Sequence, residues 1–270
     1  MKHAVCLLFL LYAVLLGAEN NPVGKDPVFT GDGKSILYQI TDNEGTPSLW
    51  LWDLQSSRQT PLKIEGQAPF RLKNGKIYYR TAGLFAELYE LDLLKKSGKQ
   101  VELPEAMAGT PMEKSDDEVV YPVGFDDPPE LYVWKVSTGK AIPETTFPKT
   151  LQALSPDGKW MVLTTKFKGM RNLALADRKT GKIVFETKQT AERGCYGAVF
   201  SPDSRYLVYQ TTGIQPISDL ALLDLKTLKV TKLTSDNADN HAPAFSPDGK
   251  KLVFCFLKGD LYRLKIIYLP

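Results

Sequence analysis

The stretch of this sequence that comes nearest to a chemical motif is Gly31-Asp32-Gly33-Lys34-Ser35. Its Gly-Lys-Ser ending is that of a phosphate-binding loop, in which backbone N–H groups and the lysine hold phosphate oxygens. Such a loop also needs a glycine five residues before Gly33, where this sequence has Val28. The stretch is therefore more typical of a turn between two strands than of a nucleotide site.

Three other kinds of site lack the residues that they need. A serine hydrolase needs Gly-x-Ser-x-Gly, a pattern that does not occur in the sequence. A histidine-rich metal site needs several imidazoles, whereas His241 is the one histidine after residue 18. The acidic loop 236–240 has Ala238 where a calcium loop uses an oxygen ligand, and no glycine follows Asn240. We therefore predict no catalytic residue, no metal and no cofactor.

The first 18 residues are typical of a secretory signal. Lys2 is followed by an apolar run over residues 4–16 and then by Gly17-Ala18. These are the basic start, the apolar core and the small residue at the cleavage site of such a signal. We expect cleavage after Ala18 and a periplasmic or otherwise exported protein; the alternative is an uncleaved anchor. No later stretch approaches the roughly 20 apolar residues of a membrane helix, so we expect the mature chain not to be embedded in a membrane.

The composition limits the kinds of partner and of cross-link that we expect for residues 19–270. Over the full sequence the 34 basic and 31 acidic residues nearly cancel, which argues against nucleic acid as the main partner. Cys195 and Cys255 are too few for a disulfide framework, and Cys255 lies in an apolar run. We expect both to be small buried apolar residues; one disulfide is the alternative.

A repeated turn gives the clearest signal in the sequence. Ser-Pro-Asp-Gly or a close variant occurs in apolar surroundings at residues 155–158, 201–204 and 246–249, and looser copies come earlier in the chain. Proline, aspartate and glycine favour the backbone angles of a tight turn, and the flanking residues favour strands. The six copies are separated by 42, 42, 41, 46 and 45 residues, counted at one position of the turn. That position is occupied by Asp32, Asn74, Asp116, Asp157, Asp203 and Asp248.

Each copy is followed by a further strand signal, and most copies by two, so a complete unit holds four short strands. Six four-stranded units of this length predict an all-β, six-bladed β-propeller of antiparallel blades over residues 19–270. The alternative is an open solenoid or a sandwich. The last unit ends before a fourth strand, and we predict that the segment near Asn20 to Lys25 pairs there and closes the ring. The other possibility is an edge left open for a partner strand.

The pattern from Pro243 to Phe254 resembles the WD40-like repeat of the TolB family, and the resemblance extends over nearly all of the mature chain. It implies a periplasmic propeller with an envelope partner, since TolB contacts a peptidoglycan-associated lipoprotein and the Tol complex. TolB carries a separate domain before its propeller, whereas here the first repeat begins about ten residues after the predicted cleavage point. The repeat therefore implies the fold more strongly than it implies a Tol partner.

One position of the repeat predicts a binding site. If the strand before each turn is innermost, the residues two before the Pro243 position form a ring at one end of the axial channel. These residues are Lys25, Gln67, Gly109, Thr150, Tyr196 and His241. We expect a scaffold that binds an envelope protein or peptide; a sugar-binding propeller or a propeller enzyme is the alternative, as is a mouth filled only with water. Phe85, Phe125 and Phe147 are candidate interface anchors, or else they cover blade edges.

Overall fold

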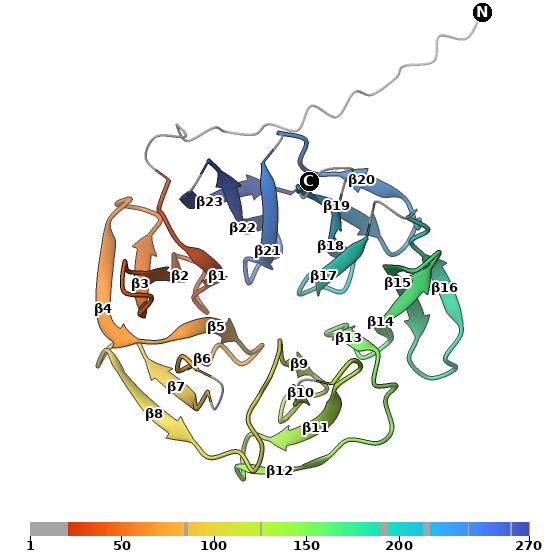
Figure 1. Ribbon diagram of the computed structural model, residues 1–270, viewed down its shortest axis with the longest axis horizontal. Coiled ribbons are helices and arrows are strands. Elements are labelled where there is room, and N and C mark those ends of the chain that lie inside the picture. The colour runs from red at the N-terminus through yellow and green to blue at the C-terminus, as the bar shows by residue number, and fades with distance from the viewer. Residues whose placement is uncertain are drawn as a thin grey trace, which may run out of the picture.

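The computed structural model describes residues 21–83, 86–124, 126–189, 194–212, 217–236, 238–259 and 261–269. Within these ranges the chain forms 23 strands and no helix, in six antiparallel sheets arranged as a closed ring (Figure 1). The prediction of a six-bladed propeller is confirmed, and the solenoid and sandwich alternatives are excluded. The predicted signal peptide, residues 1–18, lies outside the described residues.

Each blade is a meander in which consecutive strands pair, with the first strand innermost. The inner strands are β1 (Lys25–Phe29), β5 (Gln67–Arg71), β9 (Met112–Glu113), β13 (Leu151–Leu154), β17 (Cys195–Phe200) and β21 (Asp239–Phe245). The second strands are β2 (Ser35–Thr41), β6 (Ile77–Arg80), β10 (Glu118–Val123), β14 (Trp160–Phe167), β18 (Tyr206–Thr212) and β22 (Lys251–Lys258).

The outer half of each blade completes the meander. The third strands are β3 (Pro47–Asp53), β7 (Leu88–Asp92), β11 (Glu130–Lys135), β15 (Met170–Asp177), β19 (Ser218–Asp224) and β23 (Leu261–Tyr268). The outermost strands are β4 (Gln59–Glu65), β8 (Ser97–Val101), β12 (Lys140–Pro143), β16 (Ile183–Glu186) and β20 (Val230–Lys232). The sixth sheet, β21-β22-β23, has three strands.

The amino-terminal segment supplies the missing edge of the sixth blade. Val23 bridges Arg263 in antiparallel fashion. The Gly24 N–H donates to the Tyr262 carbonyl at 3.0 Å, and the Leu264 N–H donates to the Pro22 carbonyl at 2.9 Å. The prediction that residues near 20–25 close the ring is confirmed, and the first and sixth blades share one continuous piece of chain.

The core consists of six apolar clusters, and each lies between two neighbouring blades. In β2, Ile36 and Tyr38 pack toward the sixth blade, whereas Leu37 packs toward the second blade. Successive side chains of a strand point to opposite faces, so one strand serves two interfaces. A single blade leaves both of these faces bare, which is why the units fold only side by side.

The repeated turns are held by one hydrogen-bond pattern. In the sixth blade the Ser246 hydroxyl donates to Asp248 Oδ1 at 2.5 Å, and Oδ1 also accepts the Lys250 N–H at 3.1 Å. The turns at Ser155 and Ser201 repeat these contacts, and Thr30 replaces serine in the first blade. The motif read as a possible phosphate loop, residues 31–35, is therefore one of these turns.

Two smaller predictions are also decided, for the cysteines and for Phe147. Cys195 and Cys255 are buried free thiols and do not form a disulfide. Phe147 is half-buried against the cluster between the third and fourth blades, with the Arg178 guanidinium 5.1 Å from its ring centre. It thus covers a blade edge and does not project as an anchor. Phe85 and Phe125 lie outside the described residues.

Candidate functional site

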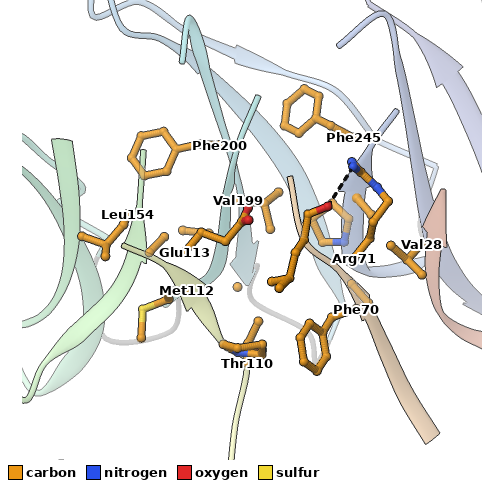
Figure 2. A pocket seen from close by; sticks show the side chains of 18 of the residues that line it. Val28, Phe70, Arg71, Thr110, Met112, Glu113, Leu154, Val199, Phe200 and Phe245 are labelled. Carbon is orange, nitrogen blue, oxygen red and sulfur yellow. Dashed lines mark hydrogen bonds between the residues drawn. The ribbon is translucent and has the colours of Figure 1, made fainter. Parts of the chain in front are cut away.

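The blades surround a central cavity of about 1270 Å³, and all six contribute to its wall. The inner strands run along the cavity from their first residues to the repeated turns. We call these two ends the strand-start end and the turn end. The cavity wall includes an apolar collar with one side chain from each blade (Figure 2). The collar comprises Val28, Phe70, Met112, Leu154, Val199 and Phe245.

Two charged side chains, Arg71 and Glu113, occupy the same position before the turn as Leu154 and Phe245 of the collar. Arg71 follows Phe70 in β5, and Glu113 follows Met112 in β9 (Figure 2). Burial raises the pKa of Glu113 above its ordinary value, although its Oε1 accepts the Lys73 N–H at 2.7 Å. Arg71 donates from Nη1 to the Leu72 carbonyl at 3.3 Å, and its buried Nε has no partner among the described residues.

A β-bulge near the start of the inner strands decides which side chains reach the cavity at the strand-start end. The pairing with the second strand shifts within β1, β5, β13, β17 and β21. Four of these bulges contain a residue with positive φ, namely Asp26, Ala68, Gly197 and Ala242. A bulge changes the face to which the following side chains point, so the simple alternation assumed from the sequence does not hold at this point.

The structure divides the predicted ring. Gly109, Tyr196 and His241 line the cavity, whereas Lys25, Gln67 and Thr150 are not among the described residues that line it. The Lys25 ammonium lies 4.1 Å from the centre of the Tyr262 ring. Gln67 donates from Nε2 to the Thr81 carbonyl at 3.1 Å.

Sequence reasoning missed Asp26 and Arg80, which line the cavity close to His241. These three residues, which we call the charged arc, belong to the first, second and sixth blades, which are neighbours in the ring. Asp26 lies within the bulge of β1 and lines the cavity, whereas Lys25 before it does not. In these three blades the bulge of the inner strand contains a dipeptide that ends in proline. The dipeptides are Asp26-Pro27, Ala68-Pro69 and Ala242-Pro243. This shared spacing was the available signal for the bulge.

Burial dominates the electrostatics of the charged arc. It raises the pKa of Asp26 above its ordinary value, although the charges of His241, Lys25 and Arg80 act in the opposite direction. Burial also lowers the pKa of His241, against the influence of Asp239 and Asp26. The imidazole is therefore neutral at pH 7, with one nitrogen donating and one accepting.

The arc does not have the composition of a metal centre. No group of three or more His, Cys, Asp or Glu side chains able to hold a metal ion occurs in the described parts of the chain. What the arc offers is one carboxylate, one guanidinium and one neutral imidazole, next to the hydroxyls of Tyr196 and Tyr262. That set can form hydrogen bonds with a polar or charged ligand.

Comparisons with known proteins agree with a propeller built from repeats. No protein-family model matches the chain. A Tricorn protease homolog from Streptomyces coelicolor is 33% identical over 102 residues, and a TolB homolog from Chlorobium chlorochromatii is 34% identical over 102 residues. Each match covers 38% of this chain, but only 9% and 22% of the two relatives. The chain thus matches a small part of each relative's length.

Solved structures resemble a much larger part of the chain. TolB from Acinetobacter baumannii has a TM-score of 0.68 at 19% identity and matches 87% of this chain and 61% of its own. A putative TolB from Agrobacterium tumefaciens has a TM-score of 0.60 at 15% identity, covering 93% and 91%. An oligogalacturonate lyase in complex with manganese has a TM-score of 0.57 at 16% identity, covering 92% and 90%. Identities this low show the fold alone.

Fold and repeats together define the class: the chain is a six-bladed β-propeller with an axial channel. The resemblance to the TolB-like repeat family, predicted from the turn motif, is confirmed by the TolB homolog, and both TolB structures share the fold. In the described parts of the chain, no helix has the length and apolar character needed to cross a membrane.

Proposed function

We propose that the protein is an exported, non-catalytic propeller that binds a protein or peptide of the cell envelope through its axial channel. The observation that carries this proposal is the size of the channel. Its volume of about 1270 Å³ exceeds the roughly 300–1,000 Å³ of most small-molecule sites. An extended peptide gains about 3.3 Å per residue, so the five-residue strand β1 matches the length of about five peptide residues.

The chemistry of the wall also suits a peptide. The apolar collar can take one or two apolar side chains, while the polar groups of the same wall can bond to the backbone of a peptide. The signal-like residues 1–18 and the likeness to TolB support an envelope location. The resemblance stated from the repeat further suggests a partner like the peptidoglycan-associated lipoprotein.

A pull-down from envelope extract tests this proposal. The mature chain, residues 19–270, is immobilised, and captured proteins are identified by mass spectrometry. We expect an envelope protein to be retained and to be released by a peptide of its own sequence. Retention of nothing above a blank resin, or retention unaffected by any peptide of the captured protein, would contradict the proposal.

The charged arc favours a second candidate function, the binding of a sugar. Asp26, Arg80 and His241 bring acceptors and donors together in the channel, and sugar hydroxyls need both. An oligogalacturonate lyase shares the fold over 92% of this chain. Titration with oligogalacturonate distinguishes the two candidates. Thermal stabilisation of the mature chain by this saccharide, combined with an empty pull-down, would favour the sugar.

A further inference from the structure

The strand-start end of the channel contains a carboxylate that the protein itself leaves without a hydrogen bond. Asp26 is half-buried and lines the channel. Among the described residues, no donor lies within hydrogen-bonding distance of its carboxylate, and none of the nine ion pairs within 4 Å includes it. An ionised carboxylate only accepts hydrogen bonds, and leaving it partly desolvated without a donor is unfavourable.

The neighbouring polar groups are already engaged with the protein. Arg80 donates from Nη1 to the Met107 carbonyl at 2.8 Å. The Lys25 ammonium lies over the Tyr262 ring. Asp239, the second carboxylate at this end, accepts the Ser218 N–H at 2.8 Å. Of the two carboxylates at this end, Asp26 is thus the one to which no described residue donates a hydrogen bond.

The repeat shows that this carboxylate is an addition to the fold and not a requirement of it. Four blades have a left-handed residue at this position, and the other three carry Ala68, Gly197 and Ala242. The bulge therefore forms without a carboxylate. Only in the first blade does the same backbone geometry project an acid toward the channel.

From this arrangement we propose that the strand-start end binds a primary ammonium group of a peptide, with Asp26 as its acceptor. The inference rests on the proposed function, because it states which part of a peptide is recognised. A charged donor forms the stronger hydrogen bond with a carboxylate. The neighbouring ring of Tyr196, which also lines the channel, favours a cation. Neutral His241 adds an acceptor, and the two cations that act on Asp26, Lys25 and Arg80, are held on the Tyr262 ring and on the Met107 carbonyl.

The test uses two mixtures of random heptapeptides with amidated carboxyl termini and without lysine. One mixture has free amino termini, and the other is acetylated. Each is passed over the immobilised mature chain, and retained peptides are measured by mass spectrometry. We expect at least tenfold greater retention of the free-amine mixture.

Two variants locate the effect. Asp26→Asn keeps the shape of the side chain, and asparagine tolerates positive φ, so the fold should persist; circular dichroism verifies this. It should reduce the preference for the free amine to about onefold. Asp116→Asn removes the same charge from an exposed residue at the turn end and should leave the preference unchanged.

Three results would overturn the inference: equal retention of both mixtures, retention of neither, or an unchanged preference in Asp26→Asn. These results are separate from failure of the proposed function. An envelope protein captured equally well by wild type and Asp26→Asn would leave the function standing and remove the ammonium site. A free-amine preference without any captured envelope protein would do the reverse.

Discussion

Asp26 combines an unusual backbone conformation with an unpaired charge, at φ 46°. Asparagine and aspartate enter the left-handed region more readily than most residues, so the conformation itself is tolerable. The desolvated carboxylate is the unfavourable part, because burial is the main cause of its raised pKa. A group that serves binding but has no partner in the free protein should lower the stability of the free protein.

We predict that Asp26→Asn stabilises the protein at pH 7 by about 1 kcal/mol, near the low end for burial of an unpaired polar group. The folded-state pKa of Asp26 lies above its unfolded value, so the folded state holds this proton more tightly. Wild-type stability relative to the variant should therefore rise as pH falls through the folded-state pKa. Thermal unfolding at pH 7 and pH 4 measures both effects. A variant that is less stable at pH 7 would contradict the prediction.

The serine of the repeated turn is the second residue whose role can be measured. Ser246 is buried, and its hydroxyl bonds Asp248 while accepting the Lys251 N–H at 2.9 Å. Ser246→Ala should therefore lower the free energy of unfolding by about 1–2 kcal/mol, measured by urea denaturation. Ser97→Ala is the control, since Ser97 is exposed in β8. An equal effect of the two substitutions would show that the turn network adds nothing.

At the scale of the element, the repeat predicted the blades well and the inner strands less well. The turn residues carry their own backbone preferences, so the turns and the flanking strands could be placed from the sequence. The bulges could not, because pairing between strands decides where a register shifts. Asp26 lies within such a bulge, and Arg80 lies in β6, outside the inner strands from which the ring was predicted. The closing segment was predicted because an unpaired edge is unfavourable.

Closure depends on the close approach of Gly24 to the first blade. A Cβ atom at Gly24 would lie 2.3 Å from Tyr38 Cδ2 and 2.8 Å from the Gln39 carbonyl oxygen. Gly24→Ala should therefore displace the segment that pairs with β23 and reduce stability by about 1–3 kcal/mol, the usual effect of overpacking. Hydrogen exchange should increase most over residues 261–268.

Gly31→Ala is the matched control for closure, because its nearest contact is milder, at 3.3 Å from Gly75 Cα. It should leave exchange in β23 unchanged. If Gly24→Ala accelerates hydrogen exchange equally in all six blades, the segment stabilises the whole ring and not the sixth blade alone.

At the scale of the whole molecule, the same geometry that buries the core also creates the site. Each blade needs a neighbour on both faces, so the blades form a ring, and a ring of six leaves space along its axis. The inner strands are therefore packed on one side and bare on the other. Their bare side gives the channel its length and its mixed wall of apolar collar and charged arc.

A binding site in the channel and a binding site on the outer edge of the ring predict different effects of adding a large side chain. Gln152 lines the channel from β13, whereas Gln100 is exposed in the outermost strand β8. Gln152→Trp should fill the channel and reduce capture of an envelope partner at least tenfold, while unfolding free energy changes by about 0.5 kcal/mol or less, as for surface positions. Gln100→Trp should leave capture unchanged. If Gln100→Trp abolished capture and Gln152→Trp did not, the binding site would lie on the outer strands, because a large side chain in the channel would then not affect the partner.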